Sequence, residues 1–127
     1  MSLKILIVDD SALTRKAIRR ILTMIDLDTS ETLEAEDGIQ AMEIMKENSI
    51  DLVLADLNMP RMGGMEMIYH MRGSEATRRI PIVIISTESS EARIEGLLAD
   101  GVDNYLHKPF TPEKLKKIIT ETLEVKL

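Results

Sequence analysis

The stretch LVLADLNMP, residues 52–60, runs from four apolar residues into an aspartate and then into an Asn-Met-Pro turn. A short, continuous apolar run predicts a strand that is covered on both faces, as in the interior of a parallel sheet. An aspartate at the end of such a strand is most often a solvated turn residue. Asp56 becomes a candidate for chemistry only if other polar groups meet it at the same edge of the sheet.

Two other segments share the character of this strand. The runs ILIV at 5–8 and IVII at 82–85 are equally apolar and rich in β-branched residues, which favours buried strands. Weaker and more polar strands are predicted at 31–35 and 103–106, and they suit the edges of a sheet. Three interior strands and two edge strands are therefore expected.

The segments between the strands carry apolar residues at the three- and four-residue spacing of amphipathic helices. Their boundaries show capping signals: Ser11, Asp37 and Thr111 are predicted N-caps, and Pro112 opens the last helix. Gly101 is expected to end the fourth helix. The pattern indicates five helices that alternate with the five strands.

Strands that alternate with helices pair in parallel through right-handed crossovers, so an α/β fold is expected. The prediction is a three-layer, doubly wound (βα)5 domain with a five-stranded parallel sheet. With the polar strands at the edges, the flavodoxin-like strand order 2-1-3-4-5 fits best. This order places a switch point between the first and third strands, and such sheets bind their ligands there, at the carboxyl ends of the strands.

The composition fits one cytoplasmic domain that spans residues 1–127. The chain has no cysteine, which excludes disulfides and thiol chemistry, and no apolar run near the roughly 20 residues of a membrane helix. A net charge of −6, without a segregated basic patch, argues against nucleic-acid binding. The chain has only one Phe, two Tyr and no Trp, too few aromatic residues to favour a base-stacking or flavin-binding surface.

Three carboxylates are expected to meet at the switch point. Asp9 and Asp10 directly follow the first strand, and Asp56 directly follows the third. Like charges at close range raise one another's pKa, a cost that a bound cation offsets. Mg²⁺, or Mn²⁺ in its place, suits oxygen ligands of this kind, and the backbone carbonyl of Asn58 is a further candidate ligand.

Two more polar groups are predicted at the same edge of the sheet. Ser86 follows the fourth strand, and Lys108 follows the fifth. A carboxylate surrounded by a hydroxyl, an ammonium and a metal ion matches the needs of phosphoryl transfer to an aspartate. In this hypothesis Asp56 is the in-line nucleophile, Lys108 pairs with the phosphoryl oxygens, and Ser86 donates a hydrogen bond.

Four motifs make the whole chain resemble the receiver domain of two-component response regulators, in particular the stand-alone, CheY-like chemotaxis type. They are ILIVDDS at 5–11, DLVLADLNMPRMGG at 51–64, PIVIIST at 81–87 and GVDNYLHKPF at 101–110. Motifs found in this order on a (βα)5 pattern are highly specific for the family.

The resemblance implies a role for each residue at the predicted metal site. Asp56 would be the phosphoacceptor, and Lys108 would contact the phosphoryl group. Asp9 and Asp10 would hold Mg²⁺ together with the Asn58 carbonyl. The peptide bond that follows Lys108 falls where the family has a cis proline.

Further residues fall at positions with switching or rate-tuning roles in the family. Ser86 takes the position of the switch hydroxyl, and Tyr105 that of the aromatic ring that turns inward as this hydroxyl moves to the phosphate. Asn58 and Glu88 stand at variable positions that influence how water reaches the acyl phosphate. Thr87 stands where the family usually has Ala or Gly, which is expected to narrow access to the phosphate.

The resemblance also implies partners and a mode of action. A sensor histidine kinase or a phosphotransfer protein would supply the phosphoryl group, and the chain would catalyse only its own phosphorylation and dephosphorylation. The phosphate would change the face formed by the fourth helix, the strand at 103–106 and the last helix, to which a downstream protein would bind. Some relatives dimerise through this face, on which Arg93, Asp103 and Tyr105 lie, so a monomer or a weak dimer is expected.

Three other hypotheses share part of this pattern. An aspartate-nucleophile phosphatase of the haloacid dehalogenase type has its nucleophile after the first strand in a D-x-D-x-T pattern, whereas DDSAL stands here at 9–13. A flavodoxin-like cofactor binder needs a phosphate-binding Ser/Thr loop after that strand and aromatic flanks, which are missing. A phosphate-independent scaffold of the same fold is disfavoured by the complete set of acidic, Lys and Ser groups.

Overall fold

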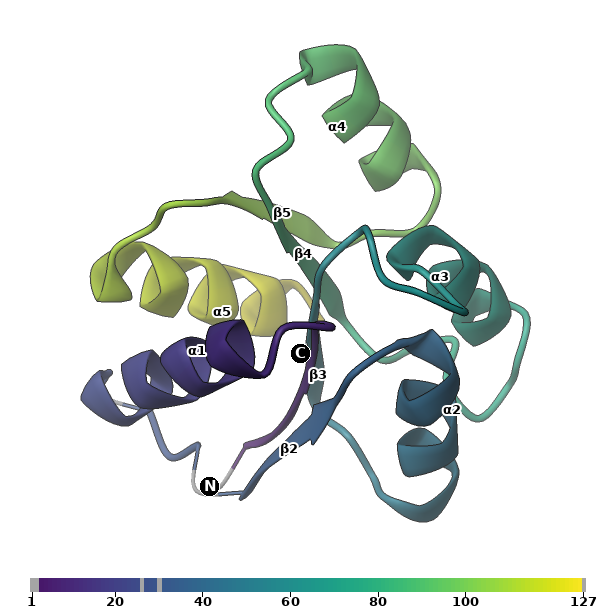
Figure 1. Ribbon diagram of the computed structural model, residues 1–127, viewed down its shortest axis with the longest axis horizontal. Coiled ribbons are helices and arrows are strands. Elements are labelled where there is room, and N and C mark those ends of the chain that lie inside the picture. Colours follow the sequence, from purple (N-terminus) through teal and green to yellow (C-terminus); the bar gives the residue numbers. More distant parts are fainter. Residues whose placement is uncertain (1–2, 26, 30, 127) are drawn as a thin grey trace.

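The computed structural model describes residues 3–25, 27–29 and 31–126, and along this part of the chain strands and helices alternate (Figure 1). The strands begin and end within one residue of their predicted bounds. The elements are β1 (Lys4–Val8), α1 (Ala12–Met24), β2 (Glu31–Ala35), α2 (Gly38–Glu47), β3 (Leu52–Ala55), α3 (Gly64–Arg72), β4 (Ile82–Ser86), α4 (Glu91–Ala99), β5 (Asn104–His107) and α5 (Pro112–Lys126).

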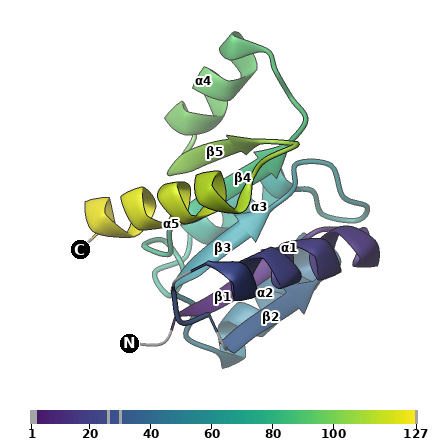
Figure 2. The same cartoon turned by 90° about the vertical axis from the view of Figure 1, so that its left-hand side faces the viewer.

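The strands form one parallel sheet in the order β2-β1-β3-β4-β5, which confirms the predicted topology. Helices α1 and α5 cover one face of the sheet, and α2, α3 and α4 lie on the other (Figures 1 and 2). The polar strands β2 and β5 stand at the two edges, as their composition predicts. Because β1 and β3 are neighbours, the residues that follow these two strands emerge side by side.

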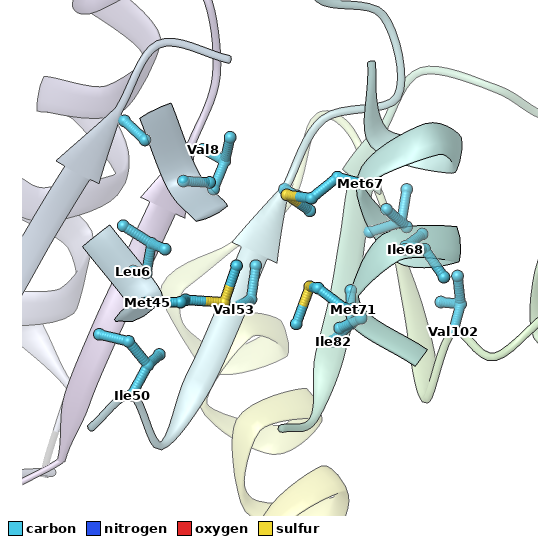
Figure 3. Packing of buried hydrophobic residues seen from close by; sticks show 14 of the residues in the cluster. Leu6, Val8, Met45, Ile50, Val53, Met67, Ile68, Met71, Ile82 and Val102 are labelled. Carbon is cyan, nitrogen blue, oxygen red and sulfur yellow. The ribbon is translucent and has the colours of Figure 1, made fainter. Parts of the chain in front are cut away.

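Side chains of the interior strands alternate between two hydrophobic clusters, one on each face of the sheet. Leu6, Val53 and Ile82 point to the side of α2 and α3, where Met45 and Met71 fill the space between helix and sheet (Figure 3). The intervening residues of the same strands pack against α1 and α5. Burial on both faces explains why these strands are continuous apolar runs.

The predicted caps of α1 and α2 make the expected hydrogen bonds. The Ser11 hydroxyl accepts from the Thr14 N–H at 3.2 Å, and the Asp37 carboxylate accepts from the Gln40 N–H at 2.8 Å. Gly101, with a φ of +109°, follows the end of α4 as predicted. In the described ranges, no helix has the length and apolar character needed to cross a membrane.

The fifth strand begins one residue later than predicted, and Asp103 lies just before it in a hydrogen-bonded cluster. The Asp103 carboxylate accepts from the Ile82 N–H at 2.7 Å and from Arg72 at 2.9 Å. Arg72 also donates to the Gly101 carbonyl at 2.7 Å and to the Ile80 carbonyl at 2.8 Å. The Asp103 carboxylate therefore helps to hold the amino-terminal ends of β4 and β5 in place.

Candidate functional site

Three carboxylates meet at the carboxyl ends of β1 and β3. Asp9 and Asp10 follow β1, Asp56 follows β3, and one oxygen from each lies within 4.8 Å of the others. The sheet ladder extends to this point. The Asp9 N–H donates to the Ala35 carbonyl at 3.0 Å. The Asp56 N–H donates to the Val8 carbonyl at 3.0 Å, so backbone hydrogen bonds hold both strand ends in place.

The three carboxylates differ in exposure: Asp9 is buried, Asp56 is half-buried and Asp10 is exposed. Asp9 is oriented from two sides. Its Oδ1 accepts a hydrogen bond from the Ser11 N–H at 2.8 Å, and its Oδ2 lies 3.5 Å from the Lys108 Nζ. The cluster thus contains one fixed carboxylate and one that solvent reaches freely.

Lys108 enters the site from the end of β5. Its backbone N–H donates to the Ser86 carbonyl at 2.8 Å, which continues the pairing of β4 with β5. The Lys108–Pro109 peptide is cis, as the resemblance implies. The ammonium group therefore reaches the carboxylates from the opposite side of β3 to β1, and it compensates part of their negative charge.

The surroundings of Asp56 act on its pKa in opposite directions. Burial raises the pKa of its carboxyl group, and the neighbouring charges of Asp9 and Asp10 act in the same direction. The Lys108 ammonium acts against this rise, as does the Leu57 N–H, which donates to the Asp56 Oδ1 at 2.8 Å. The balance leaves the pKa of Asp56 above its ordinary value.

The donor set fits a hard divalent cation. Asp9, Asp10 and Asp56 offer carboxylate oxygens, which are the ligands that Mg²⁺ prefers. Asn58 is an exposed residue of the loop after β3, two positions beyond Asp56, and its backbone carbonyl stays a predicted further ligand. A cation at this point offsets the like-charge repulsion. Mn²⁺ suits the same oxygen ligands.

Two hydroxyl groups lie on the neighbouring strands β4 and β5. Ser86 is buried, and its Oγ accepts a hydrogen bond from the Glu88 N–H at 3.2 Å. The Tyr105 hydroxyl lies 2.5 Å from the Glu88 carbonyl and 3.2 Å from the Ser86 carbonyl. Burial, together with the charges of Glu88 and Asp56, raises the pKa of the Tyr105 phenol, so this group is a neutral donor. Both hydroxyls therefore hold the connection between β4 and α4.

The residues predicted to tune reaction rates lie around the rim of the site. Thr87 and Asn58 are exposed. The Glu88 carboxylate accepts from the Ser90 N–H at 3.0 Å and lies 3.6 Å from the Arg93 Nε. In this structure the Glu88 carboxylate is thus engaged at the start of α4.

One contact to the acidic cluster was not predicted from the sequence. Arg15 of α1 donates to the Asp9 carbonyl at 2.5 Å, and it also donates to Glu34 of β2 at 3.0 Å. Arg19 binds the same Glu34 carboxylate at 2.7 Å. The two arginines fasten α1 to the edge strand beside the site. In the sequence, Arg15 is only an arginine one helical turn after Ser11. An arginine on a solvated helix face gives the same pattern, so the sequence does not reveal this contact.

The chain is similar to known proteins over most of its length. Residues 5–120 match the family of response regulator receiver domains. The chemotaxis protein CheY homolog of Campylobacter jejuni is 36% identical over 122 residues, which cover 95% of this chain and 92% of that protein. The chemotaxis protein CheY1 of Helicobacter pylori is 40% identical over 126 residues, which cover 98% of this chain and 97% of that protein.

Solved structures show the same fold. The chemotaxis response regulator CheY4 of Vibrio cholerae matches with a TM-score of 0.86 at 31% identity, over 97% of this chain and 100% of that one. The receiver domain of the sensor histidine kinase PA1611 from Pseudomonas aeruginosa matches with a TM-score of 0.85 at 26% identity, over 98% of this chain and 99% of that one. In that second structure a magnesium ion is coordinated in the active site cleft.

We expect Asp56→Asn to raise the melting temperature by several degrees at pH 7 in EDTA. Because the pKa of Asp56 is raised by folding, its ionised form favours the unfolded chain. This penalty is absent below the ordinary carboxyl pKa and grows as the pH rises through the raised value. Mg²⁺ should raise the melting temperature of the wild type more than that of the variant. Differential scanning calorimetry measures both effects.

Glu75→Gln is the control for this experiment, because Glu75 is an exposed carboxylate in the connection between α3 and β4. Its substitution should leave both the melting temperature and the effect of Mg²⁺ close to those of the wild type. A melting temperature of Asp56→Asn below that of the wild type in EDTA would contradict the assignment of the charge penalty to Asp56.

Proposed function

Because this chain belongs to the family of response regulator receiver domains, we propose that it is a phosphorylation-dependent switch of a two-component phosphorelay, with Asp56 as phosphoacceptor. The observation that carries the proposal is the convergence of Asp9, Asp10 and Asp56 within 4.8 Å. Lys108, 3.5 Å from Asp9, supplies a positive charge at the same place. The nucleophile follows β3 rather than β1, which separates the chain from phosphatases of the haloacid dehalogenase type.

Asp56 takes the phosphoryl group from a phosphohistidine of the donor. A carboxylate oxygen of Asp56 attacks phosphorus and forms a P–O bond while the P–N bond breaks, and the electron pair of that bond returns to the imidazole nitrogen. A carboxylate needs no general base. Asp9, Asp10, Asp56 and the Asn58 carbonyl would hold Mg²⁺, which would neutralise charge on the phosphoryl oxygens. Lys108 provides a second positive charge for the same oxygens.

The new phosphoryl group then changes the packing around β4 and β5. It adds a charge of about −2 beside Ser86 and Lys108. The Ser86 hydroxyl, which accepts from the Glu88 N–H at 3.2 Å in this structure, turns to donate to the phosphoryl oxygens. The rotation breaks the hydrogen bond from the Glu88 N–H, which is one of the contacts that hold the connection between β4 and α4. Tyr105, which contacts the Glu88 carbonyl at 2.5 Å, follows the connection and carries the change to α4.

An apolar groove beside the site supports a protein as the phosphoryl donor. The groove has a volume of about 370 Å³ and lies between α1 and the connection from β5 to α5. Its lining includes Leu13, Ile21 and Phe110, and also Lys108. A sensor histidine kinase or a phosphotransfer protein that contacts this groove holds its phosphohistidine next to Asp56.

The face of α4, β5 and α5 is the proposed contact surface for a downstream protein. Leu98 of α4 is 44% exposed, and Tyr105 of β5 is partly exposed, so the face offers apolar surface that a change in α4 rearranges. We assign no turnover of a separate substrate to the chain, which catalyses only its own phosphorylation and dephosphorylation. Because phosphohistidine donors of this class act in the cytoplasm, we place the chain there, as a monomer or a weak dimer.

Acetyl phosphate with Mg²⁺ is expected to add the mass of one phosphoryl group to the wild-type chain. Asp56→Asn removes the nucleophile and should gain no mass. Lys108→Ala removes a charge that stabilises the transition state, so phosphorylation should be slower by about 100-fold. Intact-mass spectrometry over time measures these changes.

Addition of EDTA before acetyl phosphate serves as the control for the metal, and it should abolish the mass gain. A wild-type chain that gains no mass with Mg²⁺, or an Asp56→Asn variant that gains as much as the wild type, would overturn the proposal. Turnover of p-nitrophenyl phosphate would favour the phosphatase hypothesis instead.

Ser86→Ala is expected to separate occupation of the site from the change in the output face. Beryllofluoride with Mg²⁺ mimics the phosphoryl group, and in the wild type it should shift the NMR signals of residues near Asp56 and those of α4 and β5. In the variant, signals near Asp56 should still shift, whereas those of α4 and β5 should move a smaller distance. Wild-type displacements in α4 and β5 of the variant would show that Ser86 is not the coupling group.

A further inference from the structure

An arginine with an unusual backbone conformation stands in the loop between β3 and α3. Arg61 has a φ of +64°, and across it the Met62 N–H donates to the Pro60 carbonyl at 2.7 Å. A three-residue turn with a positive φ at its centre is the rare, strained form of the γ-turn. Glycine adopts this conformation without steric cost, whereas arginine does not. The strain points to a role for the arginine side chain.

The guanidinium of Arg61 binds a buried carboxylate. Its Nε donates to the Asp37 Oδ2 at 2.6 Å, and one terminal nitrogen is ion-paired with the same oxygen. That nitrogen also donates to the Glu36 Oε1 at 3.0 Å. The Asp37 side chain is only 1% exposed, and it caps α2 through the Gln40 N–H. This N–H and the guanidinium hold the pKa of Asp37 below its ordinary value, against the effect of burial.

A second contact joins the same loop to α2. The Met62 carbonyl accepts a hydrogen bond from the Gly38 N–H at 2.9 Å. The Met62 side chain lies so close to this glycine that a Cβ on Gly38 would be 2.6 Å from the Met62 Cγ. The loop is therefore docked on the first turn of α2 by backbone and side chains together.

The docked loop is the one that carries Asn58. A hydrogen bond joins the two ends of this loop, because the Gly64 N–H donates to the Leu57 carbonyl at 2.9 Å. The contacts of Arg61 with Asp37 hold it between these ends. A small cavity of about 200 Å³ is lined by Arg61, by Asp10 of the acidic cluster, and by Glu36 and Pro60.

We propose that the ion pair of Arg61 with Asp37, here called the latch, positions the loop that presents the Asn58 carbonyl to a divalent cation. The inference rests on the proposed function, because it concerns the same Mg²⁺ site. Among the described residues, the ionic partners of Arg61 are Glu36 and Asp37, which lie outside the three carboxylates of the site. Arg61 and Asp37 are therefore positioning residues that act on metal affinity through the backbone.

Isothermal titration calorimetry of the full chain with Mg²⁺ tests the latch. Arg61→Gly removes the guanidinium, and the turn stays intact because glycine tolerates a positive φ. Asp37→Asn keeps an oxygen that accepts from the Gln40 N–H and removes only the charge. Each variant should bind Mg²⁺ about tenfold more weakly than the wild type, as is common for residues that support a metal ligand. The double variant should bind no more weakly than either single variant, because both substitutions remove the same contact.

Arg72→Gln is the matched control, because Arg72 forms a partly buried ion pair with Asp103 at 2.9 Å at the opposite end of the sheet. Its loss should lower the melting temperature without changing the Mg²⁺ dissociation constant. Equal weakening of Mg²⁺ binding in Arg72→Gln would overturn the latch, since a general loss of stability would then explain the result.

The remaining outcomes separate the latch from the proposed function. Wild-type dissociation constants in Arg61→Gly and Asp37→Asn would overturn the latch and leave the proposed function standing. If Arg61→Gly does not fold, Asp37→Asn alone decides in the same way. A wild-type chain that binds no Mg²⁺ would overturn the proposed function and the latch with it.

Discussion

The mutual repulsion of three carboxylates is the constraint on which the rest of the structure depends. Asp9, Asp10 and Asp56 stand together because β1 and β3 are neighbours in the sheet, and ladder hydrogen bonds hold both strand ends. Lys108 brings one positive charge to the three carboxylates, and the pKa of Asp56 remains raised, chiefly because the group is partly buried. The negative charge of the cluster exceeds the positive charge that the chain places beside it. Such a cluster is suited to attract a cation and, with it, an incoming phosphoryl group.

The same edge of the sheet connects this charge to a distant surface. Ser86 ends β4, Lys108 follows β5, and Tyr105 contacts the connection that leads into α4. To move a two-state equilibrium from mostly off to mostly on takes about 5.5 kcal/mol of differential stabilisation. One hydrogen bond to a charged group contributes about 1.5–3 kcal/mol. Two such contacts are sufficient to shift the equilibrium only if the inactive conformation is slightly more stable than the active one. A small difference in free energy of this kind is what makes a switch reversible.

Patterning along the chain was sufficient to predict the sheet and the place of the acidic cluster. The runs at 5–8, 52–55 and 82–85 are apolar throughout because helices cover both faces of these strands, and the polar strands fall at the edges where one side has no partner strand. The ion pair of Arg61 with Asp37 could not be predicted from patterning. The two residues are 24 positions apart, and arginine has no preference for a positive φ that would mark the turn.

Crystallography of the chain grown with Mn²⁺ tests the central claim most directly, because the anomalous signal of manganese locates the ion without reference to the protein density. We predict one strong peak within ligand distance of the carboxylates of Asp9, Asp10 and Asp56, on the side of the Asn58 carbonyl. A saturated crystal with no peak at this cluster, or with manganese bound only elsewhere on the chain, would contradict it.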